Sequence, residues 1–323
     1  MKGIGLRKTG RHGLRSRFTL SFSMEHRPGN NLFPDGQPTD KRRTKLVAVL
    51  FIVVALVILV AATFRIRKTD VNEVGWGRRT ALLKAASDGD VAEVKAQIAA
   101  GANLKAQDEW MDTALTLAAH GHPDCVKVLI AAHADIEMKG WQSRTALITA
   151  ASEGDLASLK LLLEAGARVN EKDADGDTAL IKAVKGGFSG CAKVLLEAHA
   201  DPDVRTPIFG NSALLSAAAN GSAICVKALL DAHAQVNVRD ADGNTPLIAA
   251  VVNGHARCVE LLIEHRADTQ TKGWTKTTEP VNGFSTPPIK GNALDYATAA
   301  GRRDIVKILR EARAKRDPIG LPK

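Results

Sequence analysis

Four cysteines could give this sequence a chemistry, either as disulfides in an oxidising compartment or as metal ligands. Each stands directly before V-K, A-K or V-E in a recurring apolar segment, at Cys125, Cys191, Cys225 and Cys258. If these segments are packed helices, neighbouring ones lie about 10 Å apart, whereas a disulfide needs Cα atoms within about 7 Å. We therefore expect four unpaired thiols that fill space in a core.

Three histidines also recur at one place, in A-H-A segments, at His133, His199 and His233. The matching segments elsewhere hold Gly101 and Gly166. Zinc ligands must converge within a few ångströms, and residues one repeat apart are too far from one another to do so. A helix C-cap, in which histidine replaces glycine and its ring meets the last carbonyls, is the expected role.

Two acidic segments, DADGD (173–177) and DADGN (240–244), resemble half of a calcium loop. Both lack the remaining ligand positions and the closing Glu at the required spacing. Asp and Gly in this order favour a β-turn.

The sequence contains no zinc motif, no phosphate-binding loop and no pairing of a nucleophile with a base in the order that known catalytic motifs have. We therefore expect no catalytic residue, no metal and no cofactor, and hence no enzyme.

The four tryptophans have a distribution that a buried role does not explain. Trp76, Trp110, Trp141 and Trp274 each precede a helix-start signal and fall where a turn is expected. Exposed aromatic rings are favoured interface anchors, although rings that lie on a neighbouring turn would give the same pattern, so both interpretations stay open. The insertion 273–291 adds Phe284 between prolines. We predict that these five residues contact a partner.

The elements that position these residues come from an internal repeat. Its helix-start residues follow one another at steps of 32 to 34 residues over the first six copies, and a seventh follows the insertion: Thr80, Thr113, Thr145, Thr178, Ser212, Thr245 and Asn292. A hydroxyl or amide there caps a helix. Nine residues later, or eight in the second copy, stands a glycine suited to positive φ, as at Gly89 and Gly121. A period of this size indicates a stacked array of helical hairpins.

The T-[AP]-L-x-x-A-A core and its period resemble the ankyrin repeat, whose unit is a β-turn finger followed by two antiparallel helices. The resemblance implies an all-α solenoid of about seven repeats that binds a partner protein through its fingers and inner helices. One family position differs, because the histidine that follows T-P-L is replaced in all copies: Leu83, Thr116, Ile148, Ile181, Leu215, Ile248 and Asp295. In the seventh copy, charged residues such as Arg302, Arg303 and Arg310 predict a solvent-facing cap.

An uninterrupted apolar stretch, 46–64, precedes the array and holds no charge, Pro or Gly. Nineteen helical residues span about 30 Å, the thickness of a bilayer core. A buried core helix or a cleaved signal peptide fits less well. The expected organisation is a basic disordered tail (1–45), a transmembrane helix (46–64), a juxtamembrane linker (65–78), the repeats (79–315) and a C-terminal tail (316–323). Met24 offers an alternative start.

The positive charge of the chain is concentrated before the repeats. Residues 1–68 hold 14 Lys and Arg against three acids, which leaves 30 against 32 for the remainder, so the repeats are nearly neutral. This argues against nucleic-acid binding. It also favours a cytoplasmic N-terminus with the repeats outside, in the periplasm if the source is bacterial.

Taken together, these features predict a membrane-anchored scaffold for a protein partner. A receptor for a small ligand or cell-wall component, and a regulatory subunit of a membrane-associated enzyme, remain alternatives.

Overall fold

The computed structural model describes residues 71–275 and 289–316. The chain divides into two compact units, 1–58 and 59–323, and every described residue belongs to the second. Among the described residues, no helix is both long enough and apolar enough to cross a bilayer. The stretch 46–64, which the sequence predicts to span a membrane, lies outside the described residues, as do Phe284, the N-terminal tail (1–45) and residues 317–323.

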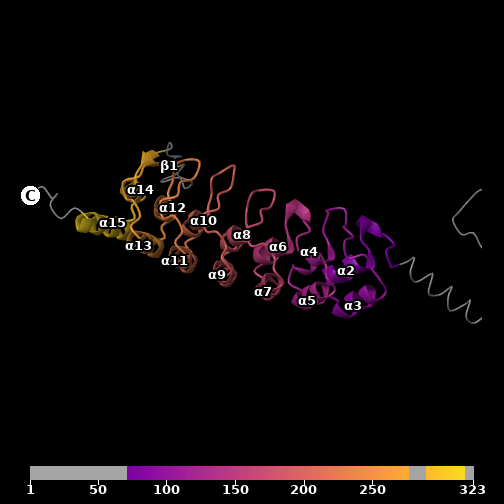
Figure 1. The fold of residues 1–323 in the computed structure, drawn as a ribbon. Coiled ribbons are helices and arrows are strands. Elements are labelled where there is room, and N and C mark those ends of the chain that lie inside the picture. The colour runs from indigo at the N-terminus through magenta and orange to yellow at the C-terminus, as the bar shows by residue number, and fades with distance from the viewer. Residues whose placement is uncertain (1–70, 276–288, 317–323) are drawn as a thin grey trace, which may run out of the picture. The chain divides into compact units, whose positions relative to one another are not determined.

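Fourteen α-helices in the described part of the chain form seven antiparallel hairpins (Figure 1). The first helices of the hairpins are α2 (Ala81–Asp88), α4 (Ala114–Ala118), α6 (Ala146–Glu153), α8 (Ala179–Lys185), α10 (Ala213–Ala219), α12 (Pro246–Asn253) and α14 (Ala293–Ala299). The second helices are α3 (Val91–Ala99), α5 (Pro123–Ala131), α7 (Leu156–Glu164), α9 (Ser189–Glu197), α11 (Ala223–Asp231), α13 (Ala256–Glu264) and α15 (Arg303–Arg316). Each first helix packs on the next first helix and each second helix on the next second helix, so two layers run through the array. This confirms the predicted all-α solenoid of seven repeats.

The first helices begin where the sequence predicts. The Thr80 hydroxyl accepts a hydrogen bond from the Leu83 backbone N–H at 3.3 Å, and the same bond recurs at all seven cap residues. At Thr113 and Asn292 the cap is reciprocal, because the side chains of Thr116 and Asp295 bond back to the cap backbone. Thr116 and Asp295 occupy the place that histidine has in the family pattern, so in these two repeats a capping box replaces the contact of that histidine.

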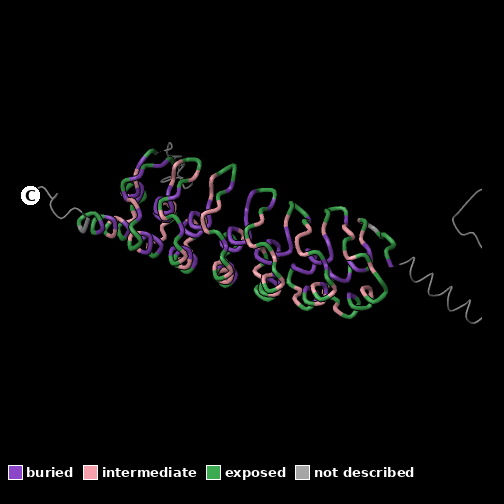
Figure 2. Tube along the Cα trace, viewed as in Figure 1, coloured by how far each residue is buried: buried purple, intermediate pink, exposed green. Residues whose placement is uncertain are grey.

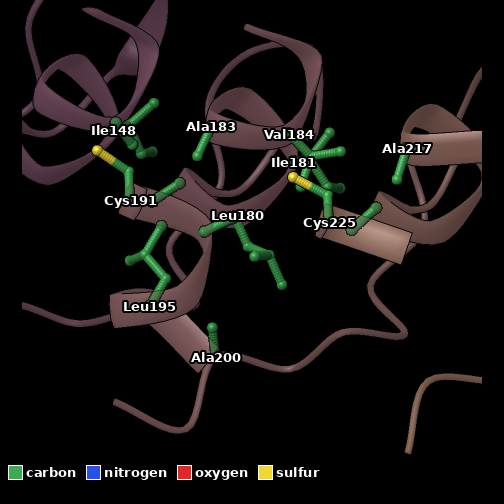
Figure 3. Close-up of a cluster of buried hydrophobic side chains, with 14 of the residues drawn as sticks. Ile148, Leu180, Ile181, Ala183, Val184, Cys191, Leu195, Ala200, Ala217 and Cys225 are labelled. Carbon is green, nitrogen blue, oxygen red and sulfur yellow. The ribbon is translucent and has the colours of Figure 1, made fainter. Parts of the chain in front are cut away.

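The core lies between the layers (Figure 2). Leucines of the first helices, such as Leu82, Leu147 and Leu180, are fully or almost fully buried. Figure 3 shows Cys191 and Cys225 among these apolar side chains. All four cysteines are buried and unpaired, as predicted. Burial raises the pKa of the thiols of Cys125, Cys191 and Cys258, with a smaller contribution from neighbouring charges.

The A-H-A histidines end the second helices as predicted. His133, His199 and His233 have φ of 60°, 60° and 62°, in the left-handed region where Gly101 and Gly166 also lie. In each case the backbone N–H donates to a carbonyl in the last turn of the helix, as from His133 to Ile130. The predicted contact of the ring with those carbonyls is absent from the hydrogen bonds of the described residues.

Side chains from one repeat cover the glycine that ends the first helix of the preceding repeat. His122 lies against Gly89, Phe188 against Gly154, and His255 against Gly221. Arg302 does the same at Gly254, and its Nη2 donates to the Val252 carbonyl at 2.9 Å. The prediction that Arg302 belongs to the solvent-facing cap is therefore wrong. Arg303 and Arg310 are exposed, as that prediction requires.

The junction of repeats 2 and 3, here called joint 2–3, lacks this contact. Asp155 follows in the sequence where four other joints have His122, Phe188, His255 or Arg302, and nothing approaches the open side of Gly121. Gly187 at joint 4–5 is open in the same way, but there Asn220 Nδ2 donates to the Lys185 carbonyl at 3.2 Å. A second link between repeats is missing at joint 2–3 as well. At five joints a side-chain oxygen accepts the backbone N–H of a residue 31 or 32 positions later: Asn72, Glu137, Asn170, Asp203 and Asn237. Lys105 holds this place in repeat 2, and its ammonium can only donate.

The insertion before the seventh hairpin starts and ends as a small sheet rather than a structureless loop. Strand β1 (Gly273–Thr275) pairs antiparallel with β2 (Ile289–Gly291). The Tyr296 hydroxyl donates to the Gly273 carbonyl at 2.7 Å and accepts from the Gly291 N–H at 3.2 Å. This buried contact holds the base of the insertion onto α14.

Candidate functional site

Each first helix is preceded by a finger, which is a loop closed by a turn. The fingers are residues 71–79, 103–112, 135–144, 168–177, 201–211, 235–244 and 268–291, numbered 1 to 7. In finger 3 the Gly140 N–H donates to the Arg144 carbonyl at 2.8 Å, and fingers 1, 2, 4 and 6 close in the same way. Residues 71–78, which the sequence assigns to a linker, form finger 1, and its Gly77 carbonyl accepts from the Glu109 N–H.

The described tryptophan side chains lie on the fingers and are about half exposed: 45% at Trp110, 52% at Trp141 and 49% at Trp274. Trp76 lies in the short 3₁₀ helix η1 (Trp76–Arg78) of finger 1. The guanidinium carbon of Arg79 lies 5.5 Å from the centre of the Trp110 ring. Lys290 Nζ lies at the same distance from Trp274. Each of these two rings thus has one face against a cation and substantial area open to solvent.

Other apolar fingertip residues escaped the sequence reasoning. Most large apolar side chains that are exposed in the described residues lie on fingers: Val74, Met111, Ile208 and Phe209 join the three tryptophans, while Leu156 and Ile224 lie elsewhere. Phe209 precedes its helix cap by three residues, as Trp110 does. An alignment of the fingers at their helix-cap residues would have identified Phe209.

A groove of about 430 Å³ lies between fingers 1–3 and the first helices α2, α4 and α6. It is bordered by the rings of Trp110 and Trp141 and extends down to the ends of α2 and α4, at Ser87 and His120. Two arginines, Arg79 and Arg144, also line it. The groove therefore spans joint 2–3 and combines aromatic walls with guanidinium groups.

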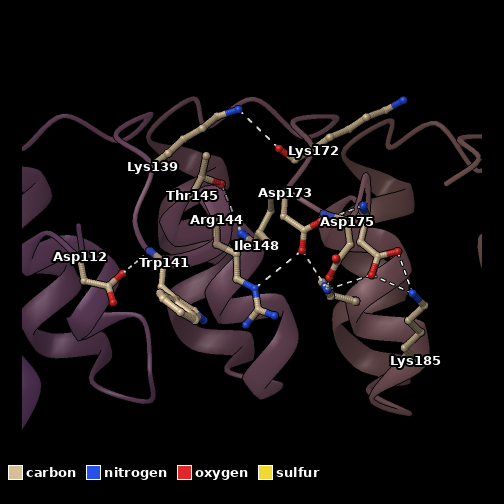
Figure 4. A network of polar contacts seen from close by, with 12 residues as sticks. Asp112, Lys139, Trp141, Arg144, Thr145, Ile148, Lys172, Asp173, Asp175 and Lys185 are labelled. Atoms are coloured by element: carbon tan, nitrogen blue, oxygen red, sulfur yellow. Dashed lines mark hydrogen bonds and ion pairs between the residues drawn. The ribbon is translucent and has the colours of Figure 1, made fainter. Parts of the chain in front are cut away.

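Asp112 positions the finger that carries Trp141 (Figure 4). Its Oδ1 accepts the Trp141 N–H at 3.0 Å and the Thr116 hydroxyl at 3.1 Å. The close approach needs a glycine, because a Cβ on Gly140 would lie 2.0 Å from the same oxygen. The Asp112 carboxylate is thus engaged within the protein, although it lines the groove.

The turns of fingers 1 to 3 carry non-glycine residues in left-handed backbone. These are Arg78, Met111, Gln142 and Ser143, with φ between 54° and 68°. Fingers 4, 5 and 6 use Gly176, Gly210 and Gly243 instead. Left-handed backbone costs a non-glycine residue about 1–2 kcal/mol, and such strain concentrates at functional sites. The strained fingers are also the ones that border the groove.

The acidic turn of finger 4 holds a lysine where a metal would bind. Asp173, Asp175 and Asp177 have carboxylate oxygens within 4.8 Å of one another. Lys182 Nζ lies 2.8 Å from Asp173 and 2.9 Å from Asp177. Burial lowers the pKa of Lys182, but the hydrogen bonds to Asp173 and Asp177 outweigh it and leave the pKa above its ordinary value. The ammonium supplies one positive charge to the three carboxylates, and Lys185 Nζ pairs with Asp177 at 2.7 Å. The Gly176 N–H closes the predicted turn onto the Asp173 carbonyl at 3.0 Å.

Comparison with known proteins agrees with this geometry. The family model described as ankyrin repeats (3 copies) matches residues 53–140, 137–206 and 188–273. The crystal structure of the human ASB11 ankyrin repeat domain is 26% identical, with a TM-score of 0.61, and the match covers 76% of this chain and all of that one. The ankyrin repeat domain of Bcl-3, a member of the IkappaB protein family, is 26% identical, with a TM-score of 0.59 over 72% of this chain and 98% of that one. No curated protein sequence matches. Repeats of this class generally mediate protein–protein interaction.

Proposed function

This chain belongs to the ankyrin repeat family, and we propose that it is a membrane-anchored scaffold that holds a protein partner on its fingertips and groove. The observation that carries the proposal is the concentration of exposed large apolar side chains on the fingers. Exposed residues of this kind scattered singly need no explanation, but several gathered on one structural feature mark an interaction site. Trp110, Trp141 and Trp274 are assigned as contact residues, together with Trp76 and Phe284 from the sequence pattern.

Tryptophan suits such a contact for a physical reason. Its large ring buries much area with few rotatable bonds, and truncation of such an anchor commonly costs 2 kcal/mol or more of binding free energy. The rings of Trp110 and Trp274 already have one face against a cation, and the backbone of Trp141 is held by Asp112. Little side-chain entropy is then lost on binding.

The proposal places the array beside a membrane. The support is the apolar stretch 46–64, which has the length and composition of a spanning helix. Finger 1 begins at residue 71 at the latest, so few residues separate the array from the bilayer surface. The charge distribution favours an N-terminus in the cytoplasm and the repeats outside, which is the periplasm in a bacterium. No nucleic-acid partner is proposed, because the repeats are nearly neutral.

No catalytic role or cofactor is part of this proposal. The described residues place one cluster of acids together, at Asp173, Asp175 and Asp177, and the ammonium groups of Lys182 and Lys185 already pair with it. Ankyrin repeat proteins act mostly as interaction scaffolds.

A photocrosslinking experiment tests the contact surface. A photoreactive phenylalanine analogue replaces Trp141 or Phe209 in the full chain within its native membrane. A matched control carries the analogue at Lys193, which is exposed on α9 and far from the fingers in the fold. We expect one discrete crosslinked partner from both finger positions and none from position 193. Equal crosslinking from all three positions would contradict a fingertip contact surface.

The membrane arrangement is tested separately. We expect the full chain to stay in the membrane fraction after alkaline carbonate washing. A C-terminal phosphatase that is active only outside the cytoplasm should be active, whereas a fluorescent protein that folds only inside should be dark. Release by carbonate would refute the anchor, and a fluorescent C-terminal fusion would reverse the orientation.

A further inference from the structure

The groove of fingers 1–3 offers hydrogen-bond donors that the protein itself does not use. Arg79 directs its Nε to Asp108 Oδ2 at 3.3 Å, and Asp108 is buried beneath it. Arg144 directs its Nε toward Asp173 at 3.7 Å, which is too long for a hydrogen bond. Among the residues that the structure describes, the terminal nitrogens of both guanidinium groups have no acceptor. Four amino groups that line the groove are therefore available to a ligand.

The acids that balance these arginines do not face the ligand. The side chains of Asp108 and Asp173 have no exposed surface. Asp112 lines the groove, and its Oδ1 is engaged by Trp141 and Thr116, so two guanidinium groups face one carboxylate there. The ligand would therefore meet donors and a positive potential. Carboxylates pair with such planar donors in a two-pronged arrangement. Charge complementarity thus favours an acidic ligand.

The aromatic walls indicate what else the ligand contains. Trp110 and Trp141 stand on adjacent fingers, one repeat apart, which is about 10 Å in packed helical arrays. An extended polyproline-type chain rises about 3.1 Å per residue, so every third residue recurs at nearly that spacing. Aromatic-lined grooves bind such segments because the ligand is already ordered before it binds. A helix would match the same spacing with residues seven positions apart, at about 10.5 Å, so the spacing of the selected residues, three or seven, distinguishes the two conformations.

We propose that this groove binds an extended segment of the partner that carries Asp or Glu beside proline or another apolar residue. The apolar residues lie between Trp110 and Trp141, and the carboxylate pairs with the terminal nitrogens of Arg144, with Arg79 as a second donor. Figure 4 shows the Arg144 side chain and the Trp141 ring on the same side of finger 3. This inference rests on the proposed function and specifies its partner.

A selection from a random nonapeptide library tests the chemistry. The full chain, purified in a mild detergent, is presented with the library on beads. We expect enrichment of Asp or Glu together with Pro or aromatic and aliphatic residues at spacings of three. Soluble fluorescein-labelled forms of the enriched peptides are then titrated by fluorescence anisotropy. Versions with Gln in place of Glu should bind about tenfold to a hundredfold more weakly.

Variants of the protein localise the binding. Arg144→Gln and Trp141→Ala should each weaken the enriched peptides at least tenfold. Lys272→Gln removes a charge on finger 7 and Ile224→Ala removes an exposed apolar side chain on α11. Both positions lie outside the groove, so these variants should leave the affinity within about twofold. Arg144→Lys keeps the charge opposite Asp173 but lacks the planar fork, so it should bind weakly while its thermal midpoint stays near that of the parent.

Two results would overturn the inference. One is enrichment of basic or uncharged peptides, and the other is acidic peptides whose affinity is unchanged in Arg144→Gln. If either occurs while positions 141 and 209 still crosslink to a partner, the fingertip function stands and only the peptide chemistry is wrong. Loss of both the enrichment and the crosslinks would remove the two proposals together.

Discussion

The phenyl ring of Phe188 lies over the α-carbon of Gly154, so that a Cβ added to this glycine would be 2.4 Å from Cδ1 of the ring. Gly187 is also left-handed, with φ of 76°, but nothing lies within 4 Å of its missing Cβ. The two glycines separate the cost of backbone strain from the cost of packing between repeats.

Replacing each glycine by alanine should therefore have unequal effects. Gly187→Ala should lose about 1–2 kcal/mol of unfolding free energy through left-handed strain alone. Gly154→Ala should lose about 1–3 kcal/mol more, because Phe188 must also move. Thermal unfolding of the full chain in detergent, followed by circular dichroism, measures the difference. Equal losses would show that the ring over glycine contributes nothing to the joint.

Lys105 interrupts a line of hydrogen bonds between repeats, so Lys105→Asn should restore one. The new amide oxygen can accept a backbone N–H of finger 3, as Asn170 accepts that of Asp201 at 2.9 Å. Because this line is solvent-exposed, we expect a gain of about 0.5–1 kcal/mol. The reciprocal change, Asn170→Lys, should lose a similar amount. If both variants have the same thermal midpoint as the parent protein, these bonds do not stabilise the array.

Lys182 should control stability in alkaline solution. Its pKa is raised in the folded state by Asp173 and Asp177, against the opposing effect of burial. Its stabilisation is therefore fully present below the unfolded value of about 10.4 and is lost as pH rises through the folded pKa. The thermal midpoint should depend on this group only above about pH 10.

Removing Lys182 tests the same network at neutral pH. Lys182→Met leaves two carboxylates buried without this cation and should cost about 3–5 kcal/mol. Lys185 contacts only Asp177 of this turn and its side chain is 40% exposed, so Lys185→Met should cost less than about 1 kcal/mol. Equal destabilisation by the two variants would contradict the central role of Lys182.

The cysteines should be inert in the folded protein. Burial raises the thiol pKa of Cys125, Cys191 and Cys258, which suppresses the reactive thiolate. With Ellman's reagent at pH 8, the native chain should react at least a hundredfold more slowly than the chain in guanidinium chloride. A fast-reacting thiol in the native chain would show that one second helix is open. Protection of this kind would also keep the thiols unpaired in oxidising solution.

Local residue identity predicted the helix starts, the left-handed caps and the buried thiols. Thr80 caps its helix and His133 ends one because these roles depend on residues a few positions away. Contacts between repeats were harder to predict. The sequence predicts that Arg302 is exposed to solvent, but the stacking of repeats places its side chain over Gly254. The groove depends on how fingers 2 and 3 stand relative to each other, and no local pattern encodes that. The sheet at the base of the insertion needs Tyr296, 23 residues beyond Gly273, to hold it.

Joint 2–3 lacks both the side chain over glycine and the bond that other joints make from the position of Lys105, and the groove lies across it. Local opening in a repeat array concentrates at its weakest interface. Two contacts still tie finger 2 to finger 3, from the Trp141 N–H to Asp112 and from Gln107 to the Lys139 carbonyl, so the spacing of Trp110 and Trp141 depends on them. A ligand in the groove would add a further link across this joint, and hydrogen exchange in α4 would slow as a result.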